Sequence, residues 1–218
     1  MREKYHISTN EDLTVKVIPE PSKRRLVLLE RLLARYSEKT ITSQKIEQLT
    51  KWSAAVIRRD ISLLDIHCGA SNGYKVAELK SALEKLLNLN NETDLKCCII
   101  GLGKMGQVLL YNSELESSPF KLIAGFDSNV NRTEVLRSSF PLHPTTMLES
   151  VIKEEKIDYA ILTVETEEAQ LIADRLSCTG IKGIVNYTSC LLTVPKEIQV
   201  ENVSLITALE TLSASNAI

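Results

Sequence analysis

Apolar residues recur every three or four positions in the first third of the chain, which predicts helices that are each buried along one face. The first helix is expected over residues 23–36, the second over 42–49 and the third over 54–64. Ser53 stands directly before the third helix as an N-cap, and Thr42 or Ser43 takes that place for the second. Two short helices joined by a tight turn are typical of a helix-turn-helix.

The segment after the third helix, residues 68–76, contains Gly69 and Gly73 and favours a β-hairpin or wing. A further amphipathic helix is expected over residues 76–87. Apolar and polar residues alternate over 13–17, which fits either a short edge strand or a frayed tail.

The rhythm changes after residue 94, where short apolar runs alternate with amphipathic stretches. Strands are expected over 96–100, 122–127, 158–164, 183–186 and 200–205, and helices over 106–115, 147–155, 165–179 and 205–213. Strands that alternate with helices and read as continuous apolar runs predict a parallel sheet covered on both faces. The expected fold class is therefore α/β, a doubly wound sheet behind a small helical domain.

Charge divides the chain at the same place. Residues 1–89 carry 16 basic and 11 acidic side chains, a balance of +5, whereas residues 90–218 carry 10 and 17, a balance of −7. The polar segment 88–94 between them is the expected joint, and two domains with different partners are indicated. The expected parts are an N-terminal extension (1–17), a helix-turn-helix domain (18–89), a parallel-sheet domain (90–203) and a terminal helix (204–218).

Composition places the 218 residues among globular proteins, with 44% apolar and 25% charged residues. No apolar run approaches the roughly 18 residues that a membrane span needs, so no membrane partner is expected. Five cysteines without a paired spacing indicate a reducing, cytoplasmic location. No spacing of His and Cys matches a metal site, so none is predicted.

The motif G-x-G-x-x-G follows the first strand of the second domain and opens its first helix, as a dinucleotide fingerprint requires. Gly101 permits a tight turn, Gly103 lets a pyrophosphate approach the backbone, and Gly106 lets the helix pack on the strand. Asp127 ends the next strand, where a carboxylate accepts hydrogen bonds from ribose hydroxyls and disfavours a 2′-phosphate. The predicted cofactor is NAD(H), in contact with this loop, including its intervening residues Leu102, Lys104 and Met105.

Basic residues gather on the helix-turn-helix. Arg58 and Arg59 lie on its second helix, where they can reach guanine edges or phosphates in the major groove. Lys45, Lys51 and Ser53 precede them and add expected backbone contacts. The alternative is a solvated basic face on a structural helical bundle.

No catalytic constellation stands out. His6, His67 and His143 are expected in the tail, before the wing and in a loop, away from any carboxylate that would orient a general base. Cys97 and Cys98 fall within a predicted strand and are read as buried, inert thiols. The chain is therefore not expected to be an enzyme.

The combination resembles the Rex family of bacterial redox-sensing transcriptional repressors, over residues 18–213. The likeness rests on several segments together, namely Ile18-Pro19, residues 53–60, Gly73-Tyr74-Lys75-Val76, residues 101–106, Phe126-Asp127, residues 161–164, 180–186, Val194-Pro195 and residues 200–203. It implies a winged helix, a Rossmann domain, and a homodimer whose C-terminal helix crosses to the partner subunit. It also implies repression from inverted-repeat operator DNA that is released by NADH.

Several roles follow only from this resemblance. Thr163, Val164, Asn186 and Tyr187 match segments near the cofactor. Two further matches belong to the family's switch between bound and released states, Tyr111 near the nicotinamide and Arg25 in the first helix.

The chain also departs from the family's pattern. Gly69 and Ala70 stand where the wing usually carries Lys-Arg, which weakens the expected minor-groove contact. Ser204 replaces an Asp expected to pair with the switch residues, so their coupling is expected to differ. Tyr187-Thr188-Ser189 and Glu165 alter the nicotinamide end of the pocket, and Glu165 is expected to point outward.

Two alternatives stay open from the sequence. One is a Rex-like DNA-binding paralogue with a weakened or altered nucleotide response. The other is a small NAD-dependent oxidoreductase, against which the missing acid–base pair and substrate domain count.

Overall fold

The computed structural model describes residues 18–64, 69–70, 73–87, 95–116 and 118–215. The tail over 1–17 and the joint over 88–94, for which the sequence made predictions, lie outside the described residues, as do His6, His67 and Cys68. The chain divides into two compact units, residues 1–91 and 92–218, and each is described by itself.

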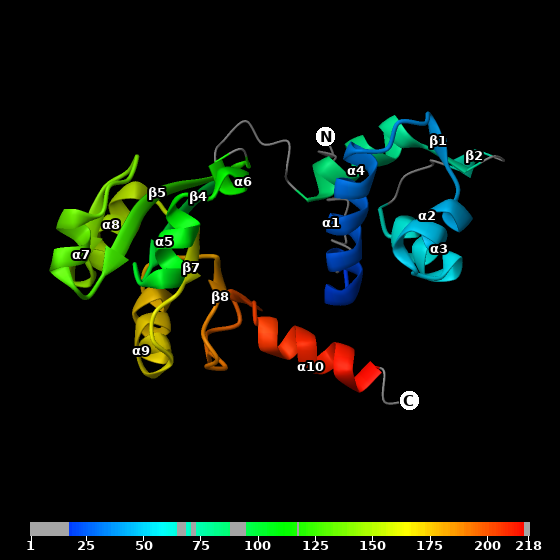
Figure 1. The fold of residues 1–218 in the computed structure, drawn as a ribbon. Helices are drawn as coiled ribbons and strands as arrows, with labels where there is room; N and C mark the ends of the chain where they lie inside the picture. Colours follow the sequence, from blue (N-terminus) through cyan, green and yellow to red (C-terminus); the bar gives the residue numbers. More distant parts are fainter. Residues whose placement is uncertain (1–17, 65–68, 71–72, 88–94, 117, 216–218) are drawn as a thin grey trace, which may run out of the picture. The chain divides into compact units, whose positions relative to one another are not determined.

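The first unit is a small helical domain with a three-stranded antiparallel sheet in the order β1-β3-β2 (Figure 1). Its elements are α1 (Glu20–Ala34), β1 (Thr40–Ile41), α2 (Ser43–Thr50), α3 (Ala54–Ser62), β2 (Gly69–Ala70), β3 (Gly73–Lys75) and α4 (Val76–Leu86). The helix-turn-helix and the wing hairpin are thus both present. Gly73 has φ +106°, and a Cβ there would lie 2.6 Å from the carbonyl oxygen of Ile41, so this hairpin position requires glycine.

Local signals set the helix-turn-helix. The Thr42 hydroxyl accepts the Lys45 N–H at the start of α2, and the Ser53 hydroxyl accepts the Val56 N–H at the start of α3. Lys51 makes the turn between them with a left-handed φ of 65°. The core collects leucines and isoleucines from every helix, namely Leu26, Leu29, Leu33, Ile46, Ile57, Ile61, Leu79 and Leu83.

The second unit is a six-stranded, all-parallel sheet in the order β6-β5-β4-β7-β8-β9. Its elements are β4 (Leu95–Ile100), α5 (Lys104–Leu110), α6 (Ser113–Glu116), β5 (Phe120–Asp127), α7 (Val130–Val135), β6 (Leu142–Pro144), η1 (Thr145–Met147), α8 (Leu148–Glu155), β7 (Tyr159–Leu162), α9 (Thr166–Ser177), β8 (Gly183–Asn186), β9 (Gln199–Asn202) and α10 (Leu205–Ser215). This is the doubly wound Rossmann order, whose crevice lies beyond the carboxyl ends of the central strands.

Alternate residues of the strands feed two separate cores. Cys98 and Ile100 face a large core completed by α8 and α9, whereas Ile99 points into a smaller core with Leu102 and Leu110. The expectation of a parallel sheet is confirmed. Helices cover both faces, and the connection between β8 and β9, which contains no helix, packs through Leu192 and Val194 against the larger core.

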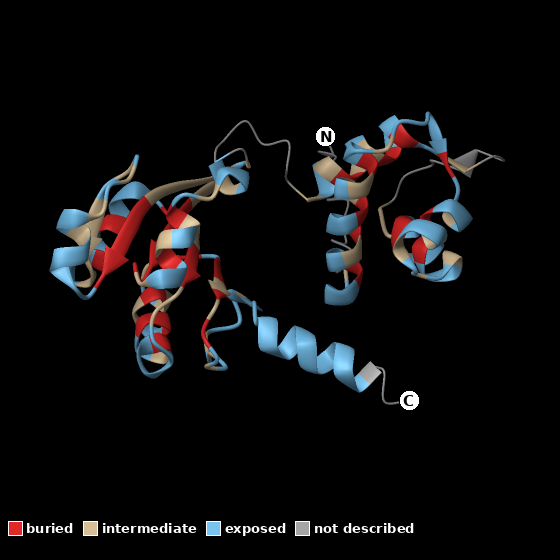
Figure 2. Cartoon of the chain, in the orientation of Figure 1, coloured by how far each residue is buried: buried red, intermediate tan, exposed pale blue. Residues whose placement is uncertain are grey.

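The terminal helix α10 is exposed on every described side chain (Figure 2). Leu205, Ile206, Leu209 and Leu212 are each between 52% and 76% exposed. The face of α5 that presents Met105, Val108 and Tyr111 is also exposed. Apolar surface on this scale is typical of a surface that contacts another part of the protein or another molecule.

Three expectations about this unit are wrong. The single helix over 106–115 is two helices, because the Asn112 side chain accepts the N–H groups of Glu114 and Leu115 and starts a new one. The helix α7 and the strand β6 were not expected. His143 therefore lies in β6 rather than in a loop, half-buried with its ring against Phe126.

Among the described residues, no helix is long and apolar enough to cross a membrane.

Candidate functional site

The glycine loop joins β4 to α5 and is fitted tightly against the end of β7. Gly101 has φ +96°, and a Cβ on it would lie 2.7 Å from the backbone of Thr163. A Cβ on Gly106 would lie 1.9 Å from the carbonyl oxygen of Gly101, so the helix packs directly on the turn. A Cβ on Gly103 would meet nothing within 4 Å. The loop is therefore closed toward the protein and open at Gly103, as a phosphate-binding turn has to be.

Thr163 fastens this loop to the neighbouring strand. Its hydroxyl donates to the carbonyl oxygen of Gly101 at 2.7 Å, and it also lies 3.1 Å from the carbonyl oxygen of Ile100. Val164 follows it and packs against the larger core. Lys104 and Met105 are exposed at the start of α5, while Leu102 is fully buried.

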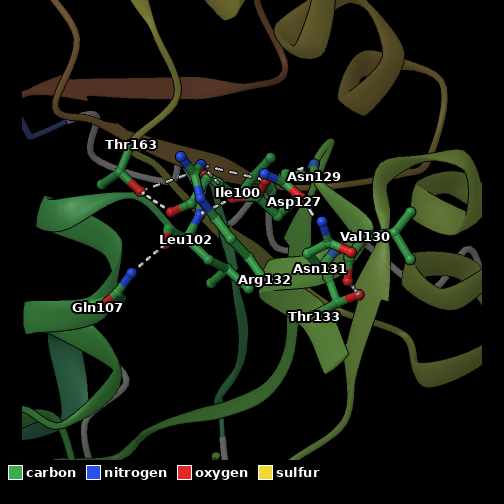
Figure 3. A network of polar contacts seen from close by, with 11 residues as sticks. Ile100, Leu102, Gln107, Asp127, Asn129, Val130, Asn131, Arg132, Thr133 and Thr163 are labelled. Carbon is green, nitrogen blue, oxygen red and sulfur yellow. Dashed lines mark hydrogen bonds and ion pairs between the residues drawn. The ribbon is translucent and has the colours of Figure 1, made fainter. Parts of the chain in front are cut away.

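Asp127 ends β5 beside the same loop (Figure 3). Its carboxylate is 2% exposed and accepts the N–H of Leu102 at 2.6 Å and of Asn129 at 2.7 Å. The Arg132 guanidinium forms an ion pair with it at 3.2 Å. This carboxylate helps to hold the loop, and its remaining hydrogen-bond acceptor sites face the Arg132 guanidinium rather than water.

Arg132 is the residue of this site that the sequence analysis missed. It lies on α7, five positions after Asp127, and its side chain is 47% exposed. The signal was a basic residue one turn beyond an acid that ends a strand. Because the sequence analysis did not predict α7, it could not place the side chain of Arg132 near Asp127.

Asn186 and Tyr187 lie at the opposite end of the site, where Asn186 ends β8 and Tyr187 follows it. The Asn186 amide donates to the carbonyl oxygen of Cys190 at 2.8 Å and to the Asn202 side chain at 2.9 Å. Its oxygen accepts the backbone N–H and the hydroxyl of Thr188. Asn186 is fully buried and every polar atom of its side chain has a protein partner, whereas Tyr187 is half-buried against the smaller core. The turn is thus internally satisfied.

Glu165 is exposed at the start of α9, as expected, and Thr166 beside it hydrogen-bonds Ser189 at 3.0 Å.

Cys97 and Cys98 are buried within β4. Burial, with the Asp158 charge adding to it, raises the pKa of the Cys97 thiol to about 12. Burial likewise raises the pKa of Cys98, and both thiols stay protonated and inert near neutral pH.

Each of the two residues matched to a switch has a partner within its own unit. The Tyr111 hydroxyl donates to the carbonyl oxygen of Arg137 at 2.6 Å. Arg25 forms a bidentate pair with Asp60 of α3, at 2.5 Å and 3.0 Å, and also donates to Ser22. Burial opposes ionisation of Asp60, but the hydrogen bonds and charge of Arg25 outweigh it and lower the pKa of this carboxyl.

The predicted DNA-contacting residues all lie on one helix pair. The exposed residues are Lys45 on α2, Lys51 in the turn, Ser53 as the N-cap of α3, and Arg58 and Arg59 on α3. Arg58 donates to the hydroxyl of Ser43 at 3.1 Å. In the wing, Gly69 and Ala70 pair with β3 and bring no positive charge.

Among the described residues, no group of acidic, histidine or cysteine side chains could hold a metal ion.

Known proteins resemble the chain in both units. A family described as a CoA binding domain matches residues 92–190, and one described as a putative DNA-binding protein N-terminus matches residues 17–62. The redox-sensing transcriptional repressor Rex of Levilactobacillus brevis is 32% identical over 92% of this chain and 95% of its own. Rex of Listeria welshimeri is 30% identical over 89% and 91%.

Solved structures agree with these relatives. RSP, described as a Rex-family repressor, is 31% identical and superposes with a TM-score of 0.80 over 90% of this chain and 92% of its own. RSP in complex with β-NAD⁺ and operator DNA gives 0.82, at 31% identity over 90% and 91%. RSP in complex with β-NADH gives 0.79, at 32% identity over 90% and 93%.

Proposed function

The chain belongs to the Rex family of redox-sensing transcriptional repressors, and we propose that it binds an inverted-repeat operator and leaves it when NADH binds. The observation that carries the proposal is the presence in one chain of an exposed basic recognition helix and a phosphate-binding glycine loop. RSP, of the same family, has been solved both with β-NAD⁺ and operator DNA and with β-NADH. The relatives of this chain are transcriptional repressors, which confirms that the chain is not an enzyme.

The glycine loop fits the adenosine diphosphate half of NAD(H). The open space at Gly103 admits the pyrophosphate close to the backbone, next to Lys104 and Met105 at the start of α5. Asp127 lies where the adenosine ribose is held in this fold, and ribose hydroxyls would compete with Arg132 for its free edge. Thr163 and Val164 would border the cofactor across from the loop.

Release of DNA by NADH requires two conformations that bind the cofactor unequally. If NADH binds the state off the DNA more tightly, then DNA lowers the affinity for NADH by the same factor. In this chain the hydrogen bond from Thr163 to Gly101 joins the glycine loop to the end of β7. A cofactor bound at the loop would therefore affect the position of this end of β7.

A homodimer supplies the contact that the exposed apolar surfaces need. The terminal helix α10 and the outer face of α5 are the surfaces in question. We place α10, within the C-terminal segment 204–218, at this dimer interface, as the family resemblance implies. Two recognition helices on one symmetric dimer would match an inverted repeat. With DNA as its partner, the protein would act in the cytoplasm.

A second candidate is a family member that binds DNA but responds weakly or differently to the cofactor. Two observations favour it. Tyr111 and Arg25 each have a partner inside their own unit. Ser204, which stands where the family usually has Asp, carries no charge that could compete with those partners.

One titration tests the proposal and separates the two candidates. The purified protein is bound to an inverted-repeat duplex recovered from a random library by the protein itself, at a stated salt concentration. NADH and NAD⁺ are then added in turn. Release by NADH at concentrations where NAD⁺ has little effect supports the redox sensor. DNA binding that neither nucleotide changes contradicts it and favours the second candidate.

A further inference from the structure

The outer surface of α3 offers few groups that can read a base. Its buried residues are Ile57, Asp60 and Ile61, and its exposed ones are Ser53, Ala55, Val56, Arg58, Arg59 and Ser62. Bases are distinguished in the major groove by hydrogen-bond donors and acceptors and by the thymine methyl group. The polar members of this surface can therefore be examined one by one.

Three of the four polar side chains already have partners in the protein. The Ser53 hydroxyl accepts the Val56 N–H as the helix cap, and the Ser62 hydroxyl donates to the carbonyl oxygen of Arg59 at 2.6 Å. The Arg58 guanidinium donates to Ser43 at the start of α2 and is drawn to that edge of the helix. No hydrogen bond or close ion pair joins the Arg59 side chain to a described residue; its charge acts on Asp60 only from a distance, so its guanidinium N–H groups are left for a guanine edge.

Val56 is the large apolar side chain on this surface, and it is 36% exposed. It lies in the first turn of α3, the part of a recognition helix that approaches the base edges. Three positions separate it from Arg59, so the two Cβ atoms lie within about 6 Å of each other along the helix. A branched aliphatic group in that place contributes no hydrogen bond, but it can cover the methyl group of a thymine.

We infer that Val56 reads the 5-methyl group of a thymine in each half-site, within two base pairs of a guanine read by Arg59, while Arg58 serves the DNA backbone. The inference rests on the proposed DNA binding and adds the chemical group that gives it specificity. The methyl group is the target, so the experiment removes that group and leaves base pairing unchanged.

The test uses the full-length protein and the duplex that it selects from a random library. Each thymine of the half-site is replaced in turn, symmetrically, by deoxyuridine, which lacks only the methyl group. The wild-type protein is expected to lose about fourfold in affinity per half-site at one thymine, the change that burial of one methyl group corresponds to. V56A is expected to bind the unmodified duplex more weakly and to be indifferent to deoxyuridine at that position.

Val27 of α1 supplies the matched control, because it is also 36% exposed and lies outside the helix-turn-helix. V27A is expected to keep the wild-type affinity and its deoxyuridine sensitivity. Thermal unfolding of each variant shows that it is folded. A V56A protein that keeps the wild-type sensitivity at the same thymine overturns the inference, and so does a wild-type protein that ignores every replacement while binding the duplex. If the wild-type protein enriches no DNA at all, the proposed function itself fails.

Discussion

The glycine-loop end and the β8–β9 end of the proposed nucleotide site use their polar groups in opposite ways. At the first end, Gly101, Gly106 and Thr163 lock against one another while the space at Gly103 stays open. At the second, Asn186 and Thr188 satisfy each other and their neighbours, and Asn186 has no exposed surface. A ligand is recognised by polar groups that have no partner within the protein, so we propose that the first end binds the ligand and that the second stabilises the fold.

The largest effect is expected from Gly106→Ala, which tests how tightly the first end is closed. The new Cβ would lie 1.9 Å from the Gly101 carbonyl oxygen, so α5 has to move away from β4. We expect a loss of roughly 3 kcal/mol or more in the free energy of unfolding, measured by denaturant titration. Gly103→Ala is the matched control, since its Cβ would meet nothing within 4 Å, and its stability should stay at the wild-type value. Equal stability of the two variants would contradict this description of the loop.

Gly103→Val separates binding from folding at the same end. Its side chain would occupy the open space where the pyrophosphate is expected, so the protein should stay folded and lose NADH affinity by about a hundredfold or more, roughly 2.7 kcal/mol. Isothermal calorimetry with NADH measures this directly. Wild-type affinity in a folded Gly103→Val protein would remove the pyrophosphate from the glycine loop.

Asn186→Ala tests the opposite end. The substitution leaves the buried N–H and hydroxyl of Thr188 without their acceptor, and we expect stability to fall by about 2–3 kcal/mol. The NADH affinity of the folded protein should change less than about threefold, under 0.7 kcal/mol. A tenfold loss of affinity with stability intact would contradict this expectation and support the contact of Asn186 with the cofactor that the family resemblance implies.

The smallest effect is expected from Thr163→Val, which keeps the volume and removes the hydroxyl that clasps Gly101. Stability should fall by about 1 kcal/mol, and NADH affinity should fall with it because the loop loosens. Thr179→Val is the control, since that hydroxyl also donates to a backbone carbonyl, of Leu176, but away from the loop. The control should lose stability alone, so an equal loss of affinity in both would show that Thr163 has no special place at the site.

Strong local signals made much of the fold predictable. Ser53 and Thr42 start helices where their side chains can cap, and β4, β5, β7 and β8 are short apolar runs that a buried parallel strand needs. The helix α7 has a cap in Asn129, whose side chain accepts the Asn131 N–H, but none of its six residues is buried, so no apolar period marked it in the sequence. The strand β6 has three residues, too few for a period to be visible.

The sequence also indicated where the site residues lie, but not what they contact. The spacing of Gly101, Gly103 and Gly106 predicted the loop because the motif depends on backbone geometry alone. The ion pair of Asp127 with Arg132, and that of Arg25 with Asp60, depend on how separate elements pack. Asn186 matched the family by position, yet only the packing of β9 beside β8 reveals that its amide is already used.

The Arg25–Asp60 pair also gives the helical unit a defined response to acid. The pKa of Asp60 is lowered in the folded state, so its pairing stabilises the unit above the ordinary carboxyl pKa, and that stability is lost as pH falls through the lowered value. Near neutral pH the recognition helix should therefore be held equally well across the physiological range.

The exposed leucines of α10 have a consequence for the amount of protein that a cell needs. If two copies must meet before either covers these side chains, the concentration of functional repressor dimer rises with the square of the free chain concentration at low abundance. A modest fall in synthesis would then lower the occupancy of operators by a larger factor than it lowers the number of repressor chains. The regulator would thus respond to its own supply as well as to its nucleotide, and dilution series should reveal that dependence before any ligand is added.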